Sequence, residues 1–395
     1  MNIVWFSWKD IDHPQAGGAE TVSWQIMLRL VKDGHQVKLI TARYKGSTER
    51  KVKDGVEIIR GGGRLSVYPK AFLMFRRELS KWPDLIIDEM NTLPFGVAFY
   101  SRRRSVLLTY QLARKVWLFQ ARFPLSWIGY VVEPLYLFIM SLRYRTVLTE
   151  SESTRQDLAR YGFAKKNTHV FRVSTELEPL ATLGEKTSLN NVLILGAMRP
   201  MKQTLSAVKG FELARDKNPS LRLTISGDSG GSYAARIIDY VASSRHADAI
   251  EIPGRVSAKQ RIEAMRSASV ILVTSIKEGW GLIVTEANTQ GTPAIAFDSD
   301  GLRDSVVDGE TGLLVKPGDV AALGQAINSL LGTKTHYESL RKQAWLHSQQ
   351  YTFDNSYSDF ANALGIYVAS SALSLVISTA HIAVLTDTSP ASMDR

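Results

Sequence analysis

Short apolar runs alternate with longer amphipathic segments along the first half of the chain. The runs are NIVWFS (2–7), QVKLITA (36–42), VEIIR (56–60), DLIIDE (84–89) and SVLLTY (105–110). Apolar runs of this length between turn residues are typical of buried strands, whereas apolar residues at helical spacing, as in TVSWQIMLRLVKDGH (21–35), predict helices. Strands that alternate with helices in this way predict a parallel sheet.

The alternation begins again after residues 174–191, a segment without periodicity that we interpret as a linker. The second series contains NVLILG (191–196), LRLTISGD (221–228), AIEIPGRV (249–256), ASVILVTS (268–275) and AIAF (294–297). A chain of 395 residues is long for one hydrophobic core, so two domains are expected. We therefore predict an α/β protein with two facing Rossmann-like domains, at 1–175 and 190–350, and a deep interdomain cleft.

Composition and charge narrow the range of partners. The chain has no cysteine, which excludes disulfides and thiolate metal sites. Its net charge of +10 calls for an acidic partner, and anionic lipid, nucleic acid and a phosphorylated substrate all fit that charge. The start of the chain is expected to be a strand and not a signal peptide, because no charged region or cleavage site precedes the first apolar run.

Residues 101–145 combine basic and large aromatic side chains on a predicted helix. They include Arg114, Lys115, Arg122, Arg143 and Arg145, interleaved with Trp117, Phe119, Phe123, Trp127, Tyr130, Tyr136, Phe138 and Tyr144. This mixture suits an anionic membrane surface, and it also suits stacking on single-stranded nucleic acid. The third interpretation is that residues 101–145 contain a core helix whose basic side chains lie on its solvent-exposed face. We expect no nucleic acid, because a nucleic-acid binder leaves the paired glutamates described below unexplained.

Residues 366–395 form an apolar tail. No Asp, Glu, Lys or Arg occurs from 360 to 386, and about 20 apolar residues are enough to cross a bilayer. Several Ser and Thr residues and His381 dilute the run, so a soluble extension packed on the first domain is the other interpretation. We predict membrane association, with 101–145 as the main contact and the tail contributing.

The most informative stretch is KEGWGLIVTEANTQG (277–291), which lies between two apolar runs. A strand, a glycine-rich turn, a short helix and a strand predict a βαβ unit whose helix starts at the carboxyl edge of the sheet, where anions bind. Gly279 and Gly281 carry no Cβ, so a ligand can approach the backbone closely. Glu278 and Glu286 flank the helix start. They either begin an ordinary solvated helix or bind a ligand with hydroxyl groups around a phosphate.

Glu278 and Glu286, with GWGLIVT between them, resemble the E-x7-E motif of retaining GT-B-fold glycosyltransferases of family 4. The run GTPAIAFDSDGLRDSVVDGETGLLVKPGD (291–319) is also similar to that family, and the resemblance covers residues 1–365. It implies a final helix, at 351–365, that crosses back onto the first domain. It implies metal-independent transfer, with retention, from a nucleotide-diphosphate sugar to a lipid-linked or surface-glycan acceptor. No metal and no cofactor besides the substrate nucleotide sugar are expected, and the protein is expected at the cytoplasmic face of the membrane.

The resemblance also implies roles for particular residues. Lys202 matches the lysine that neutralises the diphosphate, a task shared by the backbone N–H groups of Leu282 and Ile283. Glu286 matches the residue that bonds the nucleotide ribose, and Glu278 matches the one that contacts the donor sugar. The donor-binding set is completed by Gly17, Gly18, Arg199, Gly254, Arg255, Gly279, Trp280 and Gly281.

Three polar residues at and just beyond the end of the run 84–89 are the predicted acceptor contacts. Asp88, Glu89 and Asn91 lie where a parallel sheet collects its ligands. Polar residues also terminate strands routinely, and that interpretation stays open.

Two positions depart from the family pattern. Ala197 stands where the family has an arginine, and Tyr110 stands where relatives place a histidine against the donor sugar. The loss of one charge-assisted hydrogen bond costs about 1.5–3 kcal/mol, and tyrosine is a poor base. We predict Tyr110 as the third catalytic residue beside Lys202 and Glu278. Arg199 is close enough in sequence to compensate for the missing arginine. The departures leave a second hypothesis, a catalytically weak or inactive sugar-nucleotide-binding subunit at the membrane.

Overall fold

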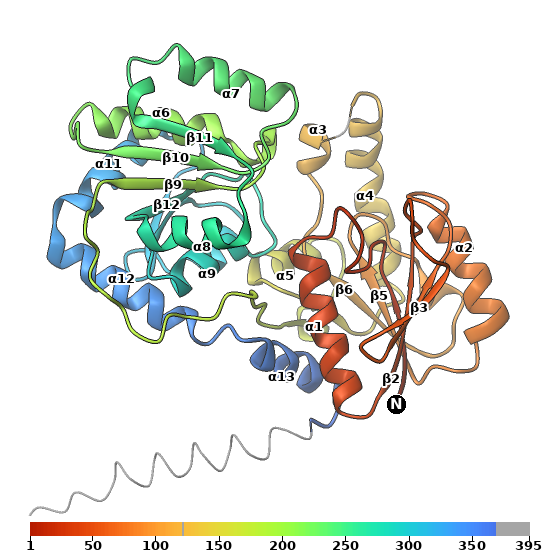
Figure 1. Ribbon diagram of the computed structural model, residues 1–395. Helices are drawn as coiled ribbons and strands as arrows, with labels where there is room; N and C mark the ends of the chain where they lie inside the picture. The colour runs from red at the N-terminus through yellow and green to blue at the C-terminus, as the bar shows by residue number, and fades with distance from the viewer. Residues whose placement is uncertain (121, 369–395) are drawn as a thin grey trace, which may run out of the picture.

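The computed structural model describes residues 1–120 and 122–368, which form two α/β units side by side (Figure 1). Each unit is built on one sheet, and the two sheets confirm the predicted fold class. Almost all of the predicted apolar tail, 366–395, lies outside the described residues, so a membrane-spanning segment there stays a prediction. Within the described ranges, no helix combines the length and the apolar character needed to cross a bilayer.

The first unit contains an eight-stranded sheet with the order β3-β4-β2-β1-β5-β6-β7-β8. The strands are β1 (Asn2–Phe6), β2 (Gln36–Thr41), β3 (Arg50–Lys53), β4 (Val56–Arg60), β5 (Leu85–Met90), β6 (Arg104–Thr109), β7 (Val147–Thr149) and β8 (Thr168–Val170). Neighbouring strands pair in parallel, except that β3 is antiparallel to β4. All six residues of β5 are buried, as expected of a central strand covered on both faces.

The helices of this unit connect its parallel strands. They are α1 (Gly18–Lys32), α2 (Val67–Met74), α3 (Val116–Gln120), α4 (Leu125–Ser141) and α5 (Glu152–Ala159). The predicted glycine pair lies at the start of α1, where Gly17 is the N-cap. At α5 the hydroxyl of Ser151 accepts the N–H of Thr154, which satisfies one of the unpaired donors of the first turn.

The second unit contains a six-stranded sheet with the order β11-β10-β9-β12-β13-β14, in which every pair is parallel. The strands are β9 (Asn191–Leu195), β10 (Arg222–Ser226), β11 (Ile250–Gly254), β12 (Val270–Val273), β13 (Ala294–Phe297) and β14 (Gly312–Val315). The helices are α6 (Thr204–Arg215), α7 (Ser232–Ala242), α8 (Ala258–Ser267), α9 (Leu282–Thr289), α10 (Leu302–Ser305), α11 (Val320–Gly332) and α12 (Lys334–Ser348). Parallel strands put all of their carboxyl ends at one edge, which positions the site described next.

The last described helix, α13 (Phe353–Leu364), packs against the first unit beside α1 (Figure 1). The ring of Phe360 stacks on the ring of Trp5, with centroids 5.7 Å apart. The guanidinium of Arg172 donates two hydrogen bonds to Asp359, of 2.7 and 2.8 Å. An apolar face and a bidentate ion pair therefore fix this helix on the first unit, although it follows the second unit in sequence.

Candidate functional site

Adjacent strands bring Lys202 and Glu278 together. β9 and β12 are neighbours in the second sheet; Lys202 ends the helical turn η4 (Pro200–Lys202) that follows β9, and Glu278 lies in the loop after β12. The Nζ atom of Lys202 lies 2.5 Å from Oε1 of Glu278, and the two side chains are 33% and 15% exposed. A partly exposed cation at the carboxyl edge of a parallel sheet is well placed to meet an anionic ligand.

Helix α9 begins at Leu282, as the sequence predicts. Its N-cap, Gly281, has φ 95°, a left-handed conformation that favours glycine. The first N–H groups of the helix, including those of Leu282 and Ile283, have no acceptor inside the helix. Together with the helix dipole, these donors make the start of α9 a favourable position for a negative charge.

Gly18 of the first unit contacts the start of this helix. A Cβ atom on Gly18 would lie 2.5 Å from Cδ1 of Leu282, so the glycine loop and α9 meet across the two units. The loop itself is fixed by Glu20, whose carboxylate accepts the N–H of Gly17 at 2.7 Å and pairs with Lys9 at 3.0 Å. The two predicted glycine turns therefore converge on one place.

Gly279 is packed still more closely against the first unit. A Cβ atom there would lie 1.7 Å from Oε1 of Glu150 and 2.9 Å from the backbone oxygen of Tyr110. Glu150 is buried just after β7, and burial together with the charges of Glu278 and Asp304 raises its pKa well above the ordinary value. Burial and these neighbouring charges therefore stabilise the protonated form of Glu150 relative to an exposed glutamate.

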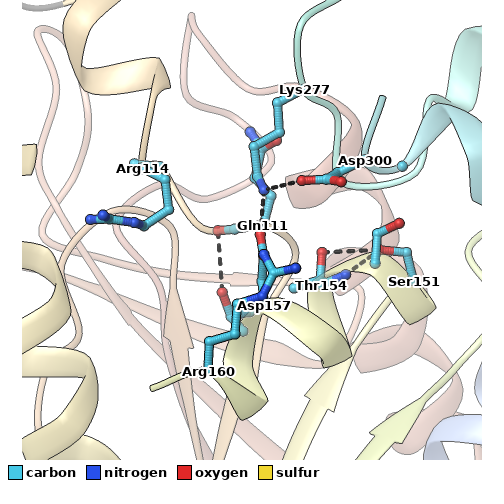
Figure 2. Close-up of polar contacts among 12 residues, drawn as sticks. Gln111, Arg114, Ser151, Thr154, Asp157, Arg160, Lys277 and Asp300 are labelled. Carbon is cyan, nitrogen blue, oxygen red and sulfur yellow. Dashed lines mark hydrogen bonds and ion pairs between the residues drawn. The ribbon is translucent and has the colours of Figure 1, made fainter. Parts of the chain in front are cut away.

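A buried ion-pair bridge joins the two units next to these residues (Figure 2). The Nζ atom of Lys277 lies 2.5 Å from Oδ2 of Asp157, on α5, and 2.9 Å from Oδ2 of Asp300, in the second unit. Burial acts to lower the pKa of Lys277, but the hydrogen bonds to the two carboxylates outweigh it and the pKa is raised. The backbone N–H of Ser153 also donates to Asp304 across the interface, at 3.1 Å.

Glu286, on α9, pairs with Arg261 of α8. Burial raises the pKa of Glu286 to about 6, against the opposing effect of the Arg261 charge. Arg261 was not part of the predicted site, because the two residues are 25 positions apart and no local pattern links them. The pair places an ionisable carboxylate, held by one cation, just beyond the first turn of α9.

The pKa of Glu286 predicts a pH dependence of nucleotide-sugar binding. If Glu286 accepts hydrogen bonds from ribose hydroxyls, its ionised form binds better, so affinity should rise as the pH rises through about 6. We expect up to about a tenfold gain between acid and neutral pH, which corresponds to one pKa unit. Calorimetric titration with a nucleotide-diphosphate sugar measures this, because its diphosphate diester does not titrate in that range. The Glu286→Gln variant should show a flat profile, and an equally steep profile in that variant would contradict the assignment.

The prediction that Asp88 contacts an acceptor is wrong, because its carboxylate is fully buried and already accepts hydrogen bonds from the protein itself. It accepts the backbone N–H groups of Phe95 and Val97, each at 3.0 Å, and the hydroxyl of Tyr144. Burial raises the pKa of Asp88, and these three hydrogen bonds oppose the rise. The residue fixes the loop after β5 instead of facing a ligand.

The predicted roles of Glu89 and Tyr110 are corrected in the same way. Glu89 is buried and accepts hydrogen bonds from the Trp5 indole, at 2.7 Å, and from the hydroxyls of Ser23, at 2.7 Å, and Ser7, at 3.1 Å. Burial raises the pKa of Glu89 to about 7. The Tyr110 hydroxyl lies 2.6 Å from that of Ser23, and its ring belongs to the core of the first unit. Tyr110 therefore presents its backbone, and not its hydroxyl, to Gly279.

Asn91 and Trp280, two further residues of the predicted site, lie in different surroundings from each other. The side chain of Asn91 donates to Glu20 at 3.4 Å, so it lies beside the glycine loop and its role as an acceptor contact stays a prediction. The indole of Trp280 is buried, donates to Thr285 at 2.9 Å and packs against the ring of Tyr351. The Trp280 side chain therefore packs inside the protein and stabilises the loop before α9. This corrects the expectation that the side chain contacts the donor.

The remaining predicted donor residues lie along the same sheet edge. Arg199 is exposed beside Lys202, and within the described part of the chain it has no ion-pair partner. Gly254 ends β11 with φ 74°, and the exposed Arg255 after it lies 3.4 Å from Asp228. Because β11 is two strands away from β9, these residues can reach a different part of an extended ligand than Lys202 does.

Two family models match the chain. The one described as Glycosyltransferase Family 4 matches residues 16–172, and the one described as Glycosyl transferases group 1 matches residues 180–346. The D-inositol 3-phosphate glycosyltransferase of Nocardia farcinica is 27% identical over 223 residues, 53% of this chain and 49% of the relative. That of Acidothermus cellulolyticus is 30% identical over 207 residues, 51% of this chain and 45% of the relative. The chain thus spans about half the length of the curated relatives it matches.

Solved structures resemble the chain over nearly all of its length. Sucrose-phosphate synthase from Thermosynechococcus elongatus matches with a TM-score of 0.74 and 20% identity, over 91% of this chain and 97% of that one. Anabaena HepE in complex with UDP and glucose matches with a TM-score of 0.68 and 17% identity, over 92% of this chain and 99% of that one. These likenesses confirm the GT-B fold. By its two family models and its fold, the chain belongs to the glycosyl transferases of group 1 and family 4.

Proposed function

We propose that this protein transfers a sugar, with retention and without a metal ion, from a nucleotide-diphosphate sugar to a glycan or lipid-linked acceptor. The observation that carries the proposal is the pair of Lys202 and Glu278 beside the start of α9, facing Gly18 of the other unit. A cation and unpaired N–H groups meet there at the edge where anions bind. The group that most needs such a site is the diphosphate that leaves with the nucleotide.

The chemistry follows from the charges that develop during transfer. As the bond between the sugar and the diphosphate breaks, negative charge grows on the leaving oxygen, and Lys202 with the N–H groups of Leu282 and Ile283 stabilises it. Glu278, released in part from Lys202 when the diphosphate binds, accepts hydrogen bonds from sugar hydroxyls. Glu286 binds the ribose. The solved relative with UDP and glucose makes a uridine diphosphate sugar the first donor to test.

The stereochemistry and the metal independence are tested together by proton NMR of a reaction with UDP-glucose. We expect the first sugar product, formed on an acceptor or on water, to carry the α-anomeric configuration of the donor. The rate should be unchanged when EDTA is added. A first product of β configuration would reject retention, and a rate that EDTA abolishes and magnesium restores would reject metal independence.

We also propose that the first unit rests on an anionic membrane through α3 and α4. These helices and the residues that flank α4 expose large apolar side chains, which are Leu118, Phe119, Phe123, Leu125, Trp127, Ile128, Val131, Val132, Leu135, Phe138, Ile139 and Leu142. Soluble surfaces rarely expose so many large apolar side chains together. Exposed arginines lie at both ends of α4, with Arg122 before it and Arg143 and Arg145 after it. An apolar face bordered by cations suits the headgroup region of a bilayer with acidic lipids.

Aspartate substitutions on α4 should weaken this attachment. Val131 and Leu135 are 64% and 60% exposed and lie one helical turn apart, so their replacement costs the fold little. Burying two such side chains in lipid contributes about 3 kcal/mol, so Val131→Asp with Leu135→Asp should weaken binding at least about tenfold. Co-sedimentation with phosphatidylglycerol vesicles measures it. The matched control is Leu213→Asp, on the exposed surface of α6; equal binding by both variants would reject this contact.

A further inference from the structure

A second cationic site lies in the first unit, at the carboxyl ends of β2 and β4. A cavity of about 650 Å³ opens there between these strand ends and the segment formed by α2 and the π-helical turn η1 (Phe75–Leu79). Its volume falls in the range of small-molecule sites. The cations that line it are Arg43, Lys45, Arg60, Lys70 and Arg77. None of these residues belongs to the donor site described above.

The acidic residues that line this cavity do not neutralise it. Glu49 pairs with Arg43 at 2.7 Å, and Glu78 pairs with Arg50, which lies outside the lining. The buried guanidinium of Arg60 is held by Asp10 at 2.6 Å, behind the cavity. These pairs account for the acids and for two of the five lining cations.

Three lining cations have no such partner. Within residues 1–120 and 122–368, Lys45, Lys70 and Arg77 form no ion pair, although all three face the same cavity. Three like charges around one hollow repel one another, and a bound anion relieves that repulsion. The sequence Gly61-Gly62-Gly63 at the end of β4 adds backbone without side chains to the wall of the cavity.

The cavity lies beside the glycine loop of the candidate site. In the sheet order β4-β2-β1-β5, β2 lies between β4 and β1. The carboxyl end of β1 leads into the loop before α1, so this loop lies beside the carboxyl end of β2. A row of aromatic contacts links the two places, because Tyr44 of the lining packs against His13 at 5.2 Å and His13 packs against Trp8 at 5.9 Å. The cavity therefore opens on the same edge as the site but farther from the second unit.

We propose that this cavity binds the phosphate group of a phosphorylated acceptor, an assignment that rests on the proposed function. The donor diphosphate is held by the second unit, so a separate cationic hollow on the first unit serves a different anion. Arginine and lysine are the side chains that bind phosphate oxygens most strongly, by charge-assisted hydrogen bonds. The phosphate belongs either to a free sugar phosphate or to a lipid headgroup, and both present the same group to Lys45, Lys70 and Arg77.

The test compares a double variant with a matched control on the same helical segment. Lys70→Ala with Arg77→Ala removes two of the three unpaired cations, whereas Arg76→Ala removes an exposed neighbour that does not line the cavity. Calorimetric titration with glucose 6-phosphate, and with glucose for comparison, measures the free ligand. Co-sedimentation with phosphatidylcholine vesicles, with and without phosphatidic acid, measures the lipid form. The vesicle co-sedimentation is carried out with variants that also carry Val131→Asp and Leu135→Asp, so that α4 contributes little to the measured membrane binding.

We expect the double variant to bind glucose 6-phosphate, or phosphatidic acid vesicles, at least about tenfold more weakly, while Arg76→Ala binds as the unsubstituted chain does. Loss in the first arm identifies a free phosphate ester and loss in the second identifies a lipid. Equal losses in the double variant and in Arg76→Ala, or no loss in either arm, would overturn the proposal. Circular dichroism and the unfolding midpoint check that each variant folds. A UDP titration of the unsubstituted chain tests the donor site separately, so the two proposals can fail independently.

Discussion

Replacing Lys202 by alanine should lower turnover of a nucleotide sugar by about a hundredfold or more. The amine is the cation nearest to Glu278, at 2.5 Å, at the edge where α9 begins. Removing one donor that stabilises developing negative charge typically costs about 10²–10³ in rate, and here the lost group also carries a full charge. The loss should appear mainly in kcat, because the charge on the leaving diphosphate grows in the transition state.

The control for this variant is Lys217→Ala, which removes an exposed lysine just beyond α6. Its turnover should match that of the unsubstituted chain, and circular dichroism should be unchanged for both variants. Turnover by Lys202→Ala within about threefold of the control would show that another cation neutralises the diphosphate. Arg199, exposed and unpaired among the described residues, would then be the next residue to replace.

Replacing Lys277 by methionine should destabilise the protein by up to about 3–5 kcal/mol. The ammonium group is buried between Asp157 and Asp300. Methionine would leave the buried Asp157 with only the exposed Arg160 as its cation, whereas Asp300, which is 34% exposed, keeps Arg303. Breaking a buried ion pair by removing one partner costs this much because the remaining charge stays desolvated. Since Asp157 and Asp300 belong to different units, the variant should also weaken the contact between the units.

Arg303→Met is the matched control for the buried bridge. Arg303 also pairs with Asp300, but its side chain is 45% exposed, and exposed pairs contribute about 0–1 kcal/mol. Urea unfolding followed by tryptophan fluorescence gives the free energy of unfolding of both variants. If the free energy of unfolding falls by the same small amount in Lys277→Met and Arg303→Met, the Lys277 bridge does not hold the units together.

Much of the fold can be predicted from the sequence because most strands of the two sheets contain short apolar runs. Parallel strands covered on both faces leave such runs, and β12 (VILV) and β13 (AIAF) show them clearly. A strand that this pattern misses is β3, whose sequence RKVK is charged and mostly exposed at the edge of the sheet. Asp54 and Gly55, both with positive φ, form the turn into β4, and this Asp-Gly signal could have indicated the hairpin.

The candidate site could be predicted only where its residues lie in one local motif. The start of α9 and the glycine turns are fixed by neighbours in sequence, so Gly281 and Leu282 are found where expected. The bridge from Lys277 to Asp157 joins residues 120 positions apart, and no periodicity indicates it. The predicted roles of Asp88 and Glu89 fail because key hydrogen-bond donors come from distant segments, Tyr144 for Asp88 and Trp5 for Glu89. Only the folded chain shows that these carboxylates are already hydrogen-bonded within the protein.

The measurement that tests the central claim most directly is release of nucleoside diphosphate from a panel of nucleotide sugars. We predict release from at least one donor above the rate in buffer, and its loss in Lys202→Ala and in Glu278→Ala. Release that both substitutions leave unchanged would place the chemistry elsewhere. Binding of UDP without release from any donor would contradict the proposed activity and favour a non-catalytic sugar-nucleotide-binding subunit.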